Sequence, residues 1–291
     1  MLSPPAWRWL LGLLLLSLLT PLYADDSGVI RYPRRAEGDE FRSRYMLAQL
    51  QLALEKAHSP LRLQPTHYSM EQERALINLE RNERLDVVWS MTSREREQRL
   101  LPVRIPLDKG LFGWRIALLP SDAPQRFKDV QGLADLRQFT AGQGHDWPDS
   151  EILRRQGLPV KVSASYGSLF RMLQAQRFDY FPRSVIEIWD ELDHPRGRPL
   201  VADPYVLLHY PAAMYFFFSP QRPELAETVR QGLELALADG SFEQLFQTHF
   251  AASLQRANLA QRRVIELNNP LLPSATPLQR RELWFTPPPA R

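Results

Sequence analysis

The hydrophobic and polar positions of this 291-residue chain follow two periods that alternate along its length. Short, mostly apolar runs such as 85–89 and 214–218 have the length and composition of buried β-strands. Longer stretches such as 223–238 carry an apolar residue every three or four positions, as on one face of a helix. Strands that alternate with such helices predict βαβ units with parallel or mixed sheets, an α/β fold. The same patterns predict further strands at 29–33, 61–65, 114–119, 160–163 and 178–181, and further helices at 41–57, 69–79, 148–157, 168–176 and 242–250.

The N-terminus has the layout of a secretory signal peptide. A short start with one positive charge, Arg8, leads into an apolar run that stops at Pro21, and the small residue Ala24 follows. We expect residues 1–24 to be removed by cleavage after Ala24. A retained membrane anchor is the alternative, but the run is shorter than the ~20 residues that span a bilayer. The mature protein is therefore expected in the periplasm, outside the membrane.

Composition narrows the classes of partner and chemistry. The chain has no cysteine, so the mature protein can carry neither a thiol-linked lipid anchor nor disulfides. Its net charge is only +3, and basic and acidic residues interleave, as in 94–99, which is typical of solvated helix faces. Export and this mixed charge both argue against a nucleic-acid partner.

The sequence offers no constellation for catalysis or metal binding. Acidic and histidine side chains do recur at helical spacing, at Glu187, Asp190, Glu191 and His194, but an amphipathic solvated face explains them. No nucleophile elbow, zinc-binding helix motif or phosphate loop is present. We therefore expect a protein without catalytic residues, metal or cofactor.

Three segments together resemble the extracellular solute-binding family 3, the polar amino-acid-binding proteins of ABC transporters. Segment 84–96 is similar to that family's strand with an Asp followed by Thr-x-x-Glu-Arg. Segment 174–181 resembles its entry into the last strand of the small lobe, and 223–250 resembles the closing helices of its large lobe. The set spans roughly 29–250 in the family's order.

The resemblance implies the type 2 periplasmic binding-protein fold, with two lobes joined by hinge strands that close over a ligand. The large lobe would comprise 25–111 and 206–255, and the small lobe would be inserted as 112–205. Crossovers would fall near 108–110 and 203–211. The prolines beyond about 256 predict an extended tail, 256–291, packed on the surface through Leu271, Leu272, Trp284 and Phe285.

The resemblance also suggests ligand-binding residues on the large lobe. Arg96 matches the arginine that grips the ligand carboxylate in amino-acid binders, where a planar guanidinium donates two parallel bonds. Its alternative is a surface arginine in a charged run. Thr92 and Ser93 follow the strand and would present hydroxyls to the cleft, while Trp89 could line the cleft or pack in the core.

On the small lobe, the glycine-rich stretch 141–147 would bring Gly144, His145 and Asp146 to a helix N-terminus that suits an anion. The family's carboxylate for the ligand ammonium should stand near 183–184, where this chain has Arg183 and Ser184. The aromatic hairpin after the first strand is replaced by Tyr32 and Arg34 among neighbouring residues. A cleft with Arg34, Arg96 and Arg183 favours an acidic ligand or one without a free amine.

The resulting hypothesis is reversible capture of a small polar solute, an amino acid or related carboxylate, by a monomer that passes it to an ABC permease. Two other functions stay open. One is an interaction or sensory protein that keeps the fold with a divergent cleft, which the missing carboxylate and the tail favour. The other is a periplasmic enzyme such as a dehydratase built on the same fold.

Overall fold

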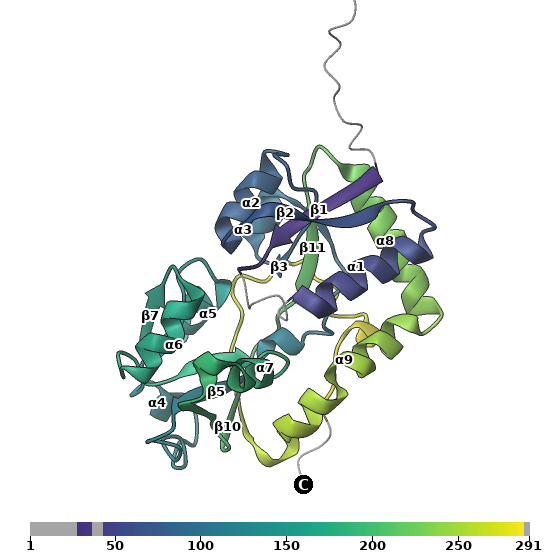
Figure 1. Ribbon diagram of the computed structural model, residues 1–291. Helices are drawn as coiled ribbons and strands as arrows, with labels where there is room; N and C mark the ends of the chain where they lie inside the picture. The colour runs from purple at the N-terminus through teal and green to yellow at the C-terminus, as the bar shows by residue number, and fades with distance from the viewer. Residues whose placement is uncertain (1–27, 37–42, 288–291) are drawn as a thin grey trace, which may run out of the picture.

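The structure is a computed structural model in which residues 28–36 and 43–287 are described. The predicted signal peptide and its cleavage site lie outside these residues. Within them, the chain forms a mixed α/β protein of two lobes (Figure 1). None of the helices in the described ranges is long and apolar enough to cross a membrane.

The first lobe contains two sheets. Strand β1 (Val29–Arg34) runs parallel to β2 (Arg62–Ser69), and β11 (Met214–Phe218) lies between β3 (Val88–Met91) and β4 (Leu101–Val103), antiparallel to both. All five side chains of β11 are buried, as its apolar sequence predicts. The helices of this lobe are α1 (Arg44–Lys56), α2 (Gln72–Glu80), α3 (Arg94–Arg99), α8 (Pro223–Ala238) and α9 (Ser241–Ala257).

The second lobe is built around β5 (Trp114–Pro120), whose seven residues are all buried. It runs antiparallel to β8 (Phe181–Ser184), β9 (Leu200–Ala202) and β10 (Val206–His209). A second, parallel pair joins β6 (Ala141–Gly144) to β7 (Val160–Ser163). Its helices are α4 (Leu133–Leu136), α5 (Pro148–Arg155), α6 (Tyr166–Gln174) and α7 (Ile188–Asp193).

Two segments of the chain cross between the lobes. The first runs from β4 through the short helix η4 (Leu111–Gly113) into β5, and the second from β10 to β11. They touch, because the Tyr210 amide donates to the Gly113 carbonyl at 3.2 Å. A Cβ on Gly113 would lie 2.0 Å from the Tyr210 carbonyl oxygen, so only glycine permits this approach. Strand β10, which the sequence analysis assigned to the large lobe, pairs with β5 in the sheet of the second lobe. The residue limits of the two lobes stay a prediction.

Most expected elements occur within a few residues of their predicted places. One difference is the helix expected from Ser69, which begins at Gln72 as α2. The reason is that Ser69 still pairs with Arg34 in the β1–β2 sheet, so its backbone is extended. Another is the strand expected at 178–181, which forms at Phe181–Ser184 as β8.

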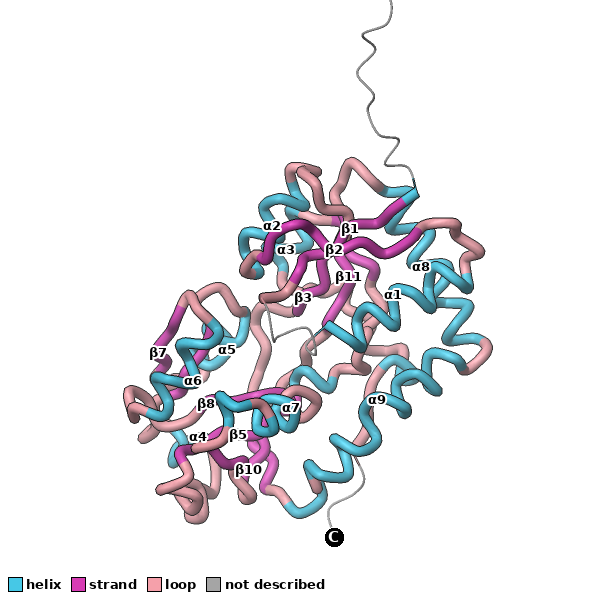
Figure 2. Tube along the Cα trace, in the orientation of Figure 1, coloured by secondary structure: helices cyan, strands magenta, loops and turns pink. Residues whose placement is uncertain are grey.

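The C-terminal segment 258–287 contributes more than a surface covering. After the short helix η6 (Leu259–Gln261), β12 (Arg263–Glu266) adds a parallel edge strand to β10 of the second lobe. The segment then runs mainly as loop to η7 (Arg281–Leu283) (Figure 2). There Leu283 is fully buried, and the Phe285 amide donates to the Lys109 carbonyl at 2.7 Å. The predicted extended tail therefore contacts both lobes and the first crossover.

Candidate functional site

A cavity of about 70 Å³ lies between the two lobes. Its walls combine charged side chains of both signs with aromatic rings and methionines, which is the composition expected of a site for a polar molecule. The lining residues are Arg35, Met46, Glu71, Gln72, Trp89, Met91, Arg96 and Met214 from the first lobe, Trp147, Pro148, Asp149, Tyr166, Arg183 and Glu187 from the second, and Phe112 from the first crossover.

Arg96 reaches the cavity from the short helix α3. Ser93 caps this helix, its Oγ accepting from the Arg96 amide at 3.2 Å. The guanidinium donates to Ser90 Oγ at 2.6 Å and to the Met91 carbonyl at 2.8 Å. A third bond, 3.0 Å long, goes to the Asp146 carbonyl of the second lobe. All three acceptors are uncharged, so burial lowers the pKa of Arg96 and the Asp146 carboxylate offsets only part of this effect.

Arg183 reaches the same cavity from β8 and has charged partners. Its Nη2 lies 2.7 Å from Glu191 Oε1 and 3.0 Å from Glu187 Oε2, and its Nε donates to Glu191 Oε2 at 2.8 Å. Burial alone would lower the pKa of Arg183, but the two carboxylates outweigh it and raise this pKa. Tyr166 completes the group by donating to Glu191 Oε1 at 2.7 Å.

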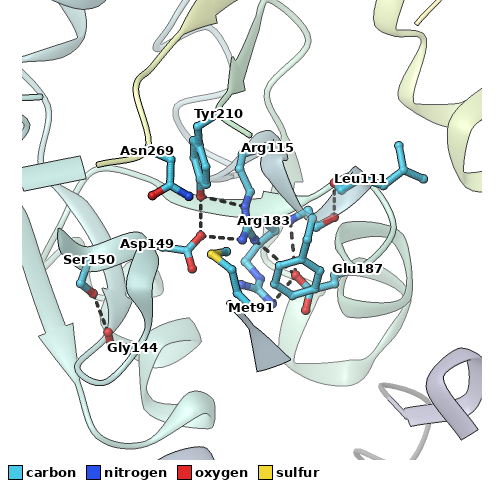
Figure 3. Close-up of polar contacts among 12 residues, drawn as sticks. Met91, Leu111, Arg115, Gly144, Asp149, Ser150, Arg183, Glu187, Tyr210 and Asn269 are labelled. Atoms are coloured by element: carbon cyan, nitrogen blue, oxygen red, sulfur yellow. Dashed lines mark hydrogen bonds and ion pairs between the residues drawn. The ribbon is translucent and has the colours of Figure 1, made fainter. Parts of the chain in front are cut away.

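A third buried arginine joins the second crossover to the second lobe (Figure 3). Arg115 donates from Nη2 to Asp149 Oδ1 at 2.5 Å and from Nε to the Tyr210 hydroxyl at 3.0 Å. Tyr210 in turn donates to Asp149. Asp149 stands in the first turn of α5, where a helix N-terminus favours negative charge. Asp149 is also one of the residues that line the cavity.

Aromatic rings cover the charged groups. The Arg183 guanidinium carbon lies 4.7 Å from the Phe181 ring centre and 5.1 Å from that of Trp147. On the first lobe, Arg35 lies 5.7 Å from the Trp89 ring centre. Such rings attract a cation over their faces and exclude water around it, which strengthens electrostatic interactions in the cavity.

A second cavity of about 290 Å³ adjoins the first. Met46, Phe112 and Glu187 line both, so Glu187 stands at the boundary. Beyond it the walls are formed by α1, α7 and α9 and carry Asp190 and His249. The interlobe space is thus elongated, with Arg96 at one end and acidic groups toward the other.

The structure brings together some of the residues expected from the sequence. Arg96, Trp89 and Arg183 line the first cavity. Asp146 contacts Arg96 through its carbonyl, at the edge of the same cavity. Trp89 is also 5% exposed in β3, so it both packs in the core and faces the cavity.

The other expected residues are engaged elsewhere in the described chain. Thr92 donates to Glu97 at 2.6 Å, Ser93 caps α3, and Arg34 bonds to Thr66. Tyr32 packs with its ring centre 6.1 Å from that of Trp89. The loop containing Gly144 and His145 passes behind the wall: the Gly144 carbonyl accepts from Ser150, and the His145 side chain is half exposed.

Sequence reasoning missed the carboxylates of the site. The expectation that the region after β8 offers no carboxylate holds at 183–184 but not one turn later, where Glu187 lines the cavity. Glu187 and Glu191 were interpreted as a solvated face, yet Glu191 is fully buried against Arg183. Arg183, Glu187 and Glu191 follow one another at intervals of four residues. This spacing was the signal in the sequence that the two carboxylates could pair with the arginine. Asp149 and Trp147 had no comparable signal.

No protein-family model and no curated protein matches the chain by sequence. Solved structures do match it in shape. An ancestral arginine-binding protein bound to arginine superposes with a TM-score of 0.57 at 15% identity, covering 77% of this chain and 98% of that one. The substrate-binding protein of an amino acid ABC transporter matches with a TM-score of 0.55 at 12% identity, covering 77% and 100%. The chain has the two-lobed fold of the type 2 periplasmic binding proteins.

This binding-protein fold was expected from the sequence and is confirmed. The same fold occurs in a histidine kinase sensor domain similar to periplasmic binding proteins, with a TM-score of 0.55 at 16% identity, covering 76% of this chain and 94% of that one. Because the matched chains are covered almost completely, the part of this chain outside the match is additional to them.

Proposed function

We propose that this protein reversibly binds a small polar solute in the interlobe cavity, without converting it chemically. The observation that carries the proposal is that both lobes supply the lining of one cavity, with Arg96 from the first and Glu187 from the second. A solute contacting both would favour the closed arrangement of the lobes, because it gains its full set of bonds only there.

The charge pattern supports a solute with an anionic and a cationic group. Arg96 has no carboxylate within ion-pair distance among the described residues, so it suits an anionic group. Glu187, at the boundary with the second cavity, already pairs with Arg183 and Arg115, so a cationic group of the solute would share its carboxylate with them. An amino acid or a related carboxylate fits this pattern. The apolar N-terminal run, with its signal-peptide layout, supports export to the periplasm, and the fold supports delivery of the solute to an ABC permease.

A screen of amino acids and small carboxylates by thermal unfolding tests this proposal, followed by calorimetric titration of any solute that raises the melting temperature. Arg96→Lys keeps the charge but loses the forked donors, so the affinity for that solute should fall about tenfold to a hundredfold. Arg94→Lys is the matched control, because Arg94 is exposed on the same helix. Equal affinity in both variants would contradict the role of Arg96.

An interaction or sensory protein is the second candidate. The likeness to a kinase sensor domain and the contacts of the C-terminal segment with both lobes favour it. If no solute changes the melting temperature, this second function is preferred. Turnover of a screened solute would instead indicate an enzyme.

A further inference from the structure

Asp146 joins the two lobes at the edge of the cavity. It stands in the loop between β6 and α5 of the second lobe. Its Oδ2 accepts from the Glu73 amide, in the first turn of α2, at 3.0 Å. Its carbonyl accepts from Arg96 Nη2, also at 3.0 Å. One residue of the second lobe therefore bonds to two elements of the first.

The groups that Asp146 meets on the first lobe are those that an anion would need. The amides in the first turn of a helix lack partners within the helix, and the helix dipole favours negative charge there. Arg96 is 4% exposed, and its guanidinium otherwise meets uncharged acceptors. The Asp146 side chain is itself only 11% exposed, so its carboxylate interacts with these groups with little screening by water.

We propose that Asp146 is a built-in ligand that holds the lobes closed without solute. Its carboxylate takes the place of an external anion at the N-terminus of α2, and its carbonyl occupies one donor of Arg96, so Asp146 sets the strength with which a solute anion must compete. This role of Asp146 can be tested independently of the proposed function, because it determines the position of the lobes when no solute is added.

The distance between the lobes in solution tests this proposal. The chain has no cysteine, so Glu83→Cys and Arg154→Cys, both at exposed positions, place one spin label on each lobe. Pulsed electron–electron double resonance then gives the distribution of distances. With Asp146 intact the closed population should dominate. In Asp146→Ala the open-to-closed ratio should rise about tenfold to a hundredfold, as expected for loss of one charge-assisted hydrogen bond.

Two comparisons make the result specific to the carboxylate. Asp190→Asn also removes an acidic group that bridges the lobes, to Arg44 at 3.3 Å, but this pair is exposed and should change the distribution little. Acetate added to Asp146→Ala should restore the closed population by occupying the site of the lost carboxylate, whereas chloride at equal ionic strength should not.

A closed distribution in Asp146→Ala, or equal opening in Asp190→Asn, would overturn the proposal, as would the failure of acetate to act differently from chloride. Asp146→Asn keeps an oxygen acceptor and removes the charge, so it should open the lobes less than the alanine variant. If Asp146→Ala does not fold, the test rests on Asp146→Asn. A distance distribution identical to that of the parent protein would then refute the proposal that Asp146 holds the lobes closed. If Asp146→Ala opens as predicted but the protein binds no screened solute, the closing role of Asp146 is supported and the proposed function is contradicted.

Discussion

Arg96 and Arg183 line the same cavity and are both buried, yet their charges have different partners in the two lobes. Arg183 bonds to two carboxylates of its own lobe, which raise its pKa. Arg96 bonds to a hydroxyl and two carbonyls, and burial lowers its pKa. A buried cation with charged partners is locally neutralised, whereas one with neutral partners keeps a field that attracts an anion. The difference supports the proposed role of Arg96, rather than Arg183, as the partner of a solute anion.

The largest expected effect comes from removing a charge on the Arg183 side. Glu191→Gln leaves a fully buried guanidinium with one carboxylate, Glu187, and replaces the charged acceptor of Tyr166 by a neutral amide oxygen. Breaking a buried ion pair costs about 3 to 5 kcal/mol, and Glu187 should keep the loss near the lower value. Urea unfolding measures the free energy of unfolding directly.

The control for this variant is Glu151→Gln, which breaks the exposed pair between Glu151 and Arg155 on α5. Here the free energy of unfolding should fall by less than about 0.5 kcal/mol, as for exposed helical pairs. Similar losses in the two variants would show that burial of the Arg183 group has no energetic consequence.

A smaller effect is expected on the Arg96 side. Arg96→Met leaves Ser90 and the carbonyls of Met91 and Asp146 without their donor but breaks no ion pair. The loss of stability should be about 2 kcal/mol, the cost of buried polar groups left unsatisfied. Arg94→Met, on the exposed face of α3, should change it by less than about 0.5 kcal/mol. A loss for Arg96→Met greater than for Glu191→Gln would reverse the comparison.

Asp108, in the first crossover, extends the comparison to a buried carboxylate. Its effect on the free energy of unfolding is the smallest of those predicted here and depends on pH. Asp108 is fully buried and accepts from the backbone amides of Gly110 and Phe112, and burial raises its pKa to about 7. In the unfolded chain an aspartate titrates near its ordinary pKa of 3.8. Between these values the folded state binds the extra proton, so this group lowers stability as the pH rises from 3.8 to 7, by at most about 1.4 kcal/mol per unit.

Asp108→Asn removes this titration. Its free energy of unfolding, relative to the parent protein, should therefore increase from pH 5 to pH 6 by about 1 kcal/mol. Urea unfolding of both proteins at the two pH values provides the measurement. A difference independent of pH would mean that Asp108 is ionised throughout, with a charged partner like that of Arg183.

The sequence predicts the elements of this fold better than its site, and particular residues show why. The period of apolar positions is a local property, so β11 and α8 occur where 214–218 and 223–238 predict them. Whether a helix face meets solvent or another element is not local, and for this reason Glu191 was taken as solvated although it is buried. Asp146 and Glu73 are 73 positions apart, and no local pattern relates them. The same holds for β12, whose partner β10 is remote in sequence.

The C-terminal segment forms a third connection between the lobes, in addition to the two crossovers. One end is anchored in the second lobe through β12, and the other in the first through Arg280, which pairs with Glu234 of α8 at 2.7 Å. Between these anchors the Leu271 carbonyl accepts from the Arg94 amide at 3.1 Å, at the start of the helix that carries Arg96. Rotation of one lobe against the other must therefore stretch or slacken this segment. Through these contacts the course of the C-terminal segment is coupled to the relative position of the two lobes.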